Sequence, residues 1–184
     1  MIFTPVAGIP GAWTIDQERH ADGRGSFGRT YDRAAFEAHG LTADIDHIAT
    51  STNRAEGTLR GMHLQTAPHG EAKTVRCTAG RAFDVVVDVR PGPTFGRWAG
   101  VELSVEEGRA LHLPIGTAHG FLTLAPDTEL TYLISTAYQP GSGSGFRWDD
   151  PAVAIDWPAT PQVLSDRDAD LPTLADWAAA QEQP

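Results

Sequence analysis

Residues of the types that transfer protons and hold anions are concentrated between positions 57 and 88. Arg60 and His63 fall within the β-rich run 59–65, Leu-Arg-Gly-Met-His-Leu-Gln, and Lys73 follows a short polar loop. A histidine that titrates near neutral pH suits general base work, and a lysine near a desolvated site can stabilise a developing oxyanion. With an arginine to hold a phosphate, these residues predict proton transfer on an anionic ligand.

The strand geometry expected for this run decides which of its side chains share a face. Alternate residues of a strand point to the same side, so His63 and Gln65 are expected on one face and Arg60 on the other, unless a β-bulge intervenes. A histidine base also needs a carboxylate on its second ring nitrogen. The candidates, between which the sequence pattern does not choose, are Asp84, Asp88, Asp166 and Asp168.

A histidine and two tyrosines in the second half of the chain are further candidates for the same site. His119 is expected on another strand of the same small β-structure. Tyr132 and Tyr138 lie six residues apart in the longest alternating run, 128–138, and are expected on one face. They are either core aromatic residues with hydroxyls at the rim, or one of them donates a proton from the side opposite His63.

A metal site is an alternative interpretation of the histidines. Metal sites in small β-barrels usually place two histidines two residues apart on one strand, whereas this strand has Gln65 two residues after His63. A facial set of His63, Glu71 and His119 could still bind a metal. Without the paired spacing, we expect no metal.

The elements that position these residues are expected to be mostly short strands. Alternating runs separated by turns rich in Gly (19) and Pro (13) indicate ten or more strands. The expected strands include 12–18, 26–31, 44–52, 98–104 and 128–138, with a helix at 33–39 capped by Asp32 and another at 171–181. This pattern predicts an all-β, double-sheet jelly roll or small barrel with short peripheral helices.

Composition limits the class of protein and its partners. The 184 residues, 41% of them hydrophobic, predict one domain spanning residues 1–184. The net charge of −10 disfavours nucleic acid and anionic membranes as partners. A single cysteine, Cys77, the lack of a signal peptide and the lack of a membrane-length apolar run predict a cytoplasmic protein.

Several longer motifs occur in a characteristic order along almost the whole chain. They include DGRGSF at 22–27, GTLRGMHLQ at 57–65, FDVVVDVR at 83–90, PTFGRW at 93–98, IDWP at 155–158 and LSDRD at 164–168. This ordered set resembles the dTDP-4-dehydrorhamnose 3,5-epimerase family. The resemblance implies a cupin-like jelly roll without a catalytic metal or nicotinamide cofactor, usually a homodimer that exchanges N-terminal strands. The implied reaction inverts carbon 3, carbon 5 or both in a nucleotide-linked 4-keto-6-deoxyhexose.

The resemblance also implies a role for individual residues. His63 corresponds to the general base with Asp168 as its partner, Tyr132 to the acid on the opposite face, and Lys73 to the group that faces the sugar carbonyl oxygen. The positions implied to bind the nucleotide, diphosphate or sugar are Arg24, Phe27, Arg60, Gln65, His119 and Tyr138.

The chain departs from the family pattern at positions that are implied to touch the substrate. His47 and Ala49 stand where many members have Gln and Asn. Arg29 and Ser144 each replace a glutamate, and Arg167 replaces a lysine. Because of these changes, the sequence does not determine which nucleotide base and which sugar the substrate carries, or which carbon is inverted. A sugar-nucleotide-binding protein of the same fold without activity is the alternative from another class, and a metal-dependent cupin enzyme is a second.

Overall fold

The computed structural model describes residues 1–181, and most of its regular structure is β-strand. A six-stranded antiparallel sheet has the order β1 (Ile2–Pro5), β2 (Trp13–Asp16), β10 (Arg109–Leu113), β7 (Lys73–Ala79), β12 (Thr128–Ile134) and β5 (His47–Asn53). A five-stranded antiparallel sheet has the order β13 (Gly143–Gly145), β6 (Leu59–Gln65), β11 (Thr117–Thr123), β8 (Arg81–Asp88) and β9 (Trp98–Ser104). The two sheets form the jelly roll that the sequence predicts.

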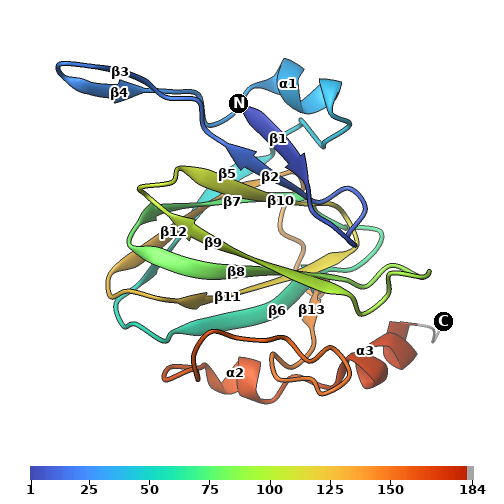
Figure 1. The fold of residues 1–184 in the computed structure, drawn as a ribbon. Helices are drawn as coiled ribbons and strands as arrows, with labels where there is room; N and C mark the ends of the chain where they lie inside the picture. The colour runs from blue at the N-terminus through green and yellow to red at the C-terminus, as the bar shows by residue number, and fades with distance from the viewer. Residues whose placement is uncertain (182–184) are drawn as a thin grey trace.

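The remaining elements lie around the two sheets. A hairpin of β3 (His20–Asp22) and β4 (Gly25–Phe27) projects away from them (Figure 1). Helix α1 (Arg33–Ala38) lies near the N-terminus, and α2 (Asp166–Ala169) and α3 (Leu174–Gln181) lie below β6 and β13 (Figure 1). No helix within residues 1–181 is long and apolar enough to cross a membrane.

The main core lies between the sheets, because alternate residues of each strand point inward. Val75 and Leu130 from the six-stranded sheet and Val86 and Phe121 from the five-stranded sheet are almost fully buried there. Cys77 belongs to the same cluster, and burial raises the pKa of its thiol to about 11. The single cysteine is therefore a core residue and is protonated at neutral pH.

A bulge in β6 changes which side chains face the core. His63 pairs with His119 on β11, whereas Arg60 pairs with Phe121, so three steps on β6 match two on β11. The extra residue shifts the alternation and places Arg60 and His63 on the same side of the sheet. The bulge that the sequence left open is present, and the assignment of Arg60 and His63 to opposite faces is wrong.

Some predicted boundaries are also wrong. The strand expected at 26–31 ends at Phe27, and the strand expected at 128–138 ends at Ile134, which leaves Tyr138 beyond the strand. Neither β13 nor α2 was expected. Strand β13 has the sequence Gly-Ser-Gly and depends on its pairing with β6, and four-residue α2 depends on its cap, Ser165. Helix α1 matches its prediction, with Asp32 as its N-cap.

Candidate active site

An open pocket of about 340 Å³ lies between the two sheets, toward the edge formed by β5, β12 and β7 on one side and β6 and β11 on the other. It is lined by His47, Ala49, Ser51, Arg60, His63, Glu71, Lys73, His119, Phe121, Tyr132, Ile134 and Tyr138. Its size is within the usual range of small-molecule sites. The structure thus brings together seven of the predicted site residues: His47, Arg60, His63, Lys73, His119, Tyr132 and Tyr138.

His63 is held by a buried carboxylate. Its Nε2 lies 2.7 Å from Oδ1 of Asp168, whose Oδ2 accepts the Gly61 N–H at 3.3 Å. Asp168 belongs to α2, and Ser165 orients this helix by accepting the Asp168 N–H. With Nε2–H donated to the carboxylate, the neutral imidazole has its lone pair on Nδ1. Of the four candidate aspartates, Asp168 is the partner.

The charge of Asp168 is stabilised in place. Burial alone would raise its pKa, but the hydrogen bond and charge of His63 and the Gly61 N–H outweigh burial, so the pKa of Asp168 lies below its ordinary value. The carboxylate therefore stays ionised at neutral pH, 2.7 Å from Nε2 of His63. This arrangement suits a base that must hold a proton temporarily.

Tyr132 lies on the opposite sheet from His63. It pairs with Ala49 of β5 and Val75 of β7, so it lies in the middle of the three strands by which the six-stranded sheet lines the pocket. Burial, and next the charge of Asp84, raise the pKa of the Tyr132 hydroxyl well above its ordinary value. Tyr132 therefore stays protonated, as a proton donor must before it acts.

His119 forms a second histidine–aspartate pair beside the first. It lies directly opposite His63 across the β6–β11 pairing, and its Nε2 is 2.7 Å from Oδ1 of Asp84. Asp84 is fully buried, and its Oδ2 has no hydrogen-bond partner among the described residues. The rings of His119 and Tyr132 meet edge to face at 5.8 Å, so this pair supports the tyrosine.

Basic groups and an aromatic ring complete the pocket. Arg60 donates through Nε to Oδ1 of Asn53 at 2.8 Å, which leaves its terminal N–H groups for an anion. Lys73, at the start of β7, lies opposite Ile134 and forms an ion pair with Glu71. Tyr138 is 66% exposed at the rim, where a planar base could stack on it.

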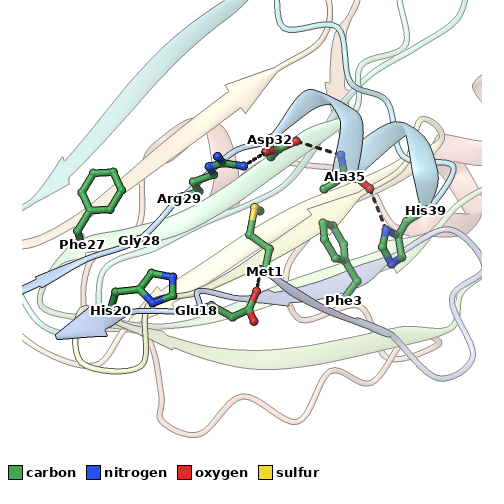
Figure 2. Close-up of a pocket in the computed structure, with 10 residues that line it drawn as sticks. All are labelled: Met1, Phe3, Glu18, His20, Phe27, Gly28, Arg29, Asp32, Ala35 and His39. Atoms are coloured by element: carbon green, nitrogen blue, oxygen red, sulfur yellow. Dashed lines mark hydrogen bonds and ion pairs between the residues drawn. The ribbon is translucent and has the colours of Figure 1, made fainter.

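Five predicted substrate contacts lie outside this pocket in the same chain. Arg24 is at the tip of the β3–β4 hairpin, with a side chain that is 91% exposed and paired with Asp22. Phe27 and Arg29 line a different pocket, of about 400 Å³, with Met1, Phe3, Glu18, His20, Gly28, Asp32, Ala35 and His39 (Figure 2). Gln65 lies behind Glu71, and Arg167 is exposed on α2.

The three residues of the alternative metal site are engaged with other groups. His63 is bound to Asp168, His119 to Asp84, and Glu71 to Lys73. Within residues 1–181, no group of three or more His, Cys, Asp or Glu side chains is placed to hold a metal ion. These contacts favour the proton-transfer interpretation of the same side chains.

Sequence reasoning missed several pocket residues. Ser51 and Phe121 continue the alternation from His47 and His119, so strand periodicity could have found both. Glu71 was considered only as a metal ligand, because its loop position gave no sign that it faces Lys73. The pairing of Asp84 with His119 depends on the register between β8 and β11, which the sequence does not reveal.

A jelly roll with a paired histidine, a protonated tyrosine and a lysine in one pocket suits acid–base chemistry on a bound ligand. Relatives named as epimerases match most of the chain and show it to be an epimerase, an enzyme of the isomerase class. The profile of the dTDP-4-dehydrorhamnose 3,5-epimerases matches residues 7–176. The chain belongs to this family.

Individual relatives agree along most of their length. A solved epimerase structure from Mycobacterium tuberculosis is 38% identical, with a TM-score of 0.93 over 100% of this chain and 94% of that one. The dTDP-4-dehydrorhamnose 3-epimerase of Streptomyces niveus is 42% identical over 172 residues, which cover 92% of this chain and 82% of its own. A 3'-monoepimerase from Streptomyces bikiniensis, solved in complex with dTDP-quinovose, is 37% identical, with a TM-score of 0.87 over 96% and 89% of the two chains.

Proposed function

We propose that the chain inverts carbon 3, carbon 5 or both in a dTDP-linked 4-keto-6-deoxyhexose, for deoxysugar biosynthesis. The observation that carries this proposal is the placement of a base and an acid on facing sheets. His63 on β6 and Tyr132 on β12 border the same pocket, with Lys73 beside them. Inversion of a carbon requires removal of a proton from one face and delivery to the other.

The proposed reaction needs only these groups. His63 Nδ1 takes the proton from the carbon next to the ketone, and the electron pair of that C–H bond forms the enolate. The charge of Lys73 stabilises the enolate oxygen. The Tyr132 hydroxyl then protonates the same carbon on the opposite face, and solvent restores both groups. Asp168 stabilises the imidazolium between these steps.

The nucleotide part of the substrate accounts for the remaining polar groups. Arg60 is the basic side chain of the pocket best placed for the diphosphate, and exposed Tyr138 offers a stacking surface for the base. His47, Gln65, His119 and Arg167 are proposed to position the sugar or nucleotide. An anionic substrate needs such local basic groups, because the chain as a whole carries a charge of −10.

We also propose a cytoplasmic homodimer whose subunits are each one domain of residues 1–184. Arg24, Phe27 and Arg29 match positions that touch the substrate in the family, yet they lie outside the pocket of their own chain. Phe27 is 76% exposed on the projecting hairpin. A partner subunit whose pocket receives this hairpin would explain both facts.

Inversion at carbon 3 alone is a second candidate within the same chemistry. The Streptomyces niveus relative, named a 3-epimerase, and the Streptomyces bikiniensis 3'-monoepimerase are as similar to the chain as the double epimerases are. The substituted positions His47 and Ala49 border the pocket, where they could alter the orientation of the sugar.

Deuterium incorporation distinguishes these candidates. In D₂O, the wild-type protein is expected to exchange the hydrogens at carbons 3 and 5 of dTDP-4-keto-6-deoxyglucose, or the hydrogen at carbon 3 alone if it is a single epimerase. Proton NMR would measure the exchange. His63→Ala should abolish the exchange. His69→Ala, which changes a nearby histidine that does not line the pocket, should retain it. Lack of wild-type exchange with this and related 4-keto sugars would contradict the proposal.

A further inference from the structure

The pocket contains an acidic side chain, Glu71, that the proposed reaction does not use. Its Oε1 lies 2.8 Å from Nζ of Lys73, and both side chains are mostly buried, with exposed fractions of 10% and 14%. Both also line the pocket in which the enolate would form. A buried carboxylate there would repel an anionic intermediate unless its charge is balanced. The ammonium ion of Lys73 balances it.

The second oxygen of Glu71 is also held. Gln65 at the end of β6 donates from Nε2 to Oε2 of Glu71 at 2.9 Å. Gln65 is itself fixed, because it is 5% exposed and its Oε1 accepts the Gln139 N–H at 2.8 Å. Glu71 therefore connects Lys73 on one sheet to β6 on the other, and to the segment that carries Tyr138. Its carboxylate has little freedom to move.

Lys73 needs such a restraint more than an arginine would. A lysine ends in a compact charge on a flexible four-carbon stem, so its position depends on its partners. Lys73 is also the only lysine in a chain with 14 basic residues. In the described residues the only carboxylate within ion-pair distance of its Nζ is Glu71.

We propose that Glu71 is a positioning residue for the epimerisation: it holds the Lys73 ammonium ion in place against the ketone oxygen of the substrate. This inference rests on the proposed function. Glu71 does not touch the reacting carbon, and it acts through Lys73. Gln65 extends the same restraint by fixing the second carboxylate oxygen.

Kinetics of Glu71→Gln test this role, because glutamine keeps the shape of the side chain and removes its charge. The expected result is a fall in kcat of about tenfold or more with KM changed less than twofold. In this variant the Lys73 ammonium ion is no longer held in place, and its charge is needed only after substrate has bound. Glu71→Asp should recover part of the loss. Glu102→Gln is the matched control and should behave as wild type. It removes an exposed carboxylate on β9 that forms an ion pair with Arg81 on β8.

Acylation of Lys73 gives a second readout that does not depend on activity. Trace acetic anhydride followed by mass spectrometry reports the reactivity of this single lysine, with the α-amino group as internal standard. Loss of the carboxylate that holds the ammonium ion should make Lys73 react several-fold faster in Glu71→Gln than in wild type or Glu102→Gln.

The two readouts separate the failure of each proposal. Unchanged acylation and unchanged kcat in Glu71→Gln would overturn the role of Glu71 while leaving the epimerase intact. Faster acylation with unchanged kcat would also overturn it, because the restraint would then have no effect on the reaction. An inactive wild type would contradict the proposed function, and acylation would still show whether Glu71 holds Lys73.

Discussion

Two histidines that line the pocket each lie 2.7 Å from an aspartate, but the surroundings of the two pairs differ. The His63 side chain is 34% exposed, whereas the His119 side chain is 7% exposed and its partner Asp84 is fully buried. The more accessible imidazole can meet a substrate carbon and exchange its proton with solvent. We therefore propose His63 as the base and a supporting role for His119.

Replacement of Asp168 by asparagine tests the first pair. The amide keeps the size of the side chain but cannot stabilise the imidazolium, so kcat should fall by about 10² with little change in the fold. Steady-state kinetics and circular dichroism would measure both. A kcat within a factor of two of wild type would contradict the role of Asp168.

The single lysine allows a test of Lys73 itself. Acylation of one side chain should inactivate the enzyme, because the enolate oxygen loses its positive partner. Saturating dTDP should slow the inactivation by covering the pocket. Mass spectrometry would count the modified sites, and full activity after complete Lys73 acylation would show that its charge is not needed.

Residue identities were more predictable than their contacts. His63, Lys73, His119 and Tyr132 were found from type and strand position, and the structure places all four in one pocket. The carboxylate partners of the two histidines were not assignable from the residues alone. Asp168, for example, is about a hundred positions from His63 in the chain. Such contacts depend on tertiary packing, which local sequence patterns do not encode.

At the scale of elements, the bulge where β6 meets β11 positions His63, the proposed base. Gly61 has a φ of +135°, which favours glycine, and a Cβ there would lie 2.5 Å from the Cα of Gly120. A Cβ on Gly120 would in turn lie 2.5 Å from Sδ of Met62. The two strands approach closely at the point where the alternation shifts. Sequence patterns showed the strands, whereas this offset required the paired structure.

Gly120→Ala should disturb that approach. The added methyl group overpacks the contact with Met62, so we expect a loss of about 1–3 kcal/mol in the free energy of unfolding and a lower kcat as Arg60 and His63 shift. Gly23→Ala is the control for stability, since its Cβ would meet nothing within 4 Å. Urea denaturation would measure both variants, and equal stabilities would contradict the packing argument.

The pairing of β7 with β10 makes stability depend on pH through a buried histidine. Burial lowers the pKa of His112 to about 4, and its Nδ1 lies 2.8 Å from the Thr74 hydroxyl. The unfolded chain then binds the proton more readily, so stability is full above about pH 6.5 and falls as the pH drops toward 4, by about 3 kcal/mol. Urea denaturation at several pH values in this range would give the free energy of unfolding as a function of pH. This dependence should be weaker for His112→Gln than for wild type, and an equal dependence would contradict the role of His112.

At the scale of the whole molecule, the projecting hairpin is the feature that one chain does not explain. The hairpin projects away from the two sheets (Figure 1). Arg24 at its turn lies outside the pocket, with a side chain that is 91% exposed. If Arg24 contacts substrate in a partner subunit, then His63→Ala and Arg24→Ala damage each site through different chains. Co-expression of the two inactive variants should restore about a quarter of wild-type activity to the whole population, because about half of the dimers are mixed and each mixed dimer has one intact site of two. A monomer in analytical ultracentrifugation, or no restoration in proven mixed dimers, would contradict this arrangement.

In the proposed reaction, proton removal and proton delivery occur on opposite faces of the carbon, through His63 and Tyr132. The most direct measurement follows both deuterium incorporation and epimer formation in D₂O for wild type, His63→Asn and Tyr132→Phe. We predict that His63→Asn loses both, whereas Tyr132→Phe still exchanges the hydrogen with retained configuration and forms epimer at least 100-fold more slowly. Wild-type epimer formation by Tyr132→Phe, or wild-type exchange by His63→Asn, would contradict the account.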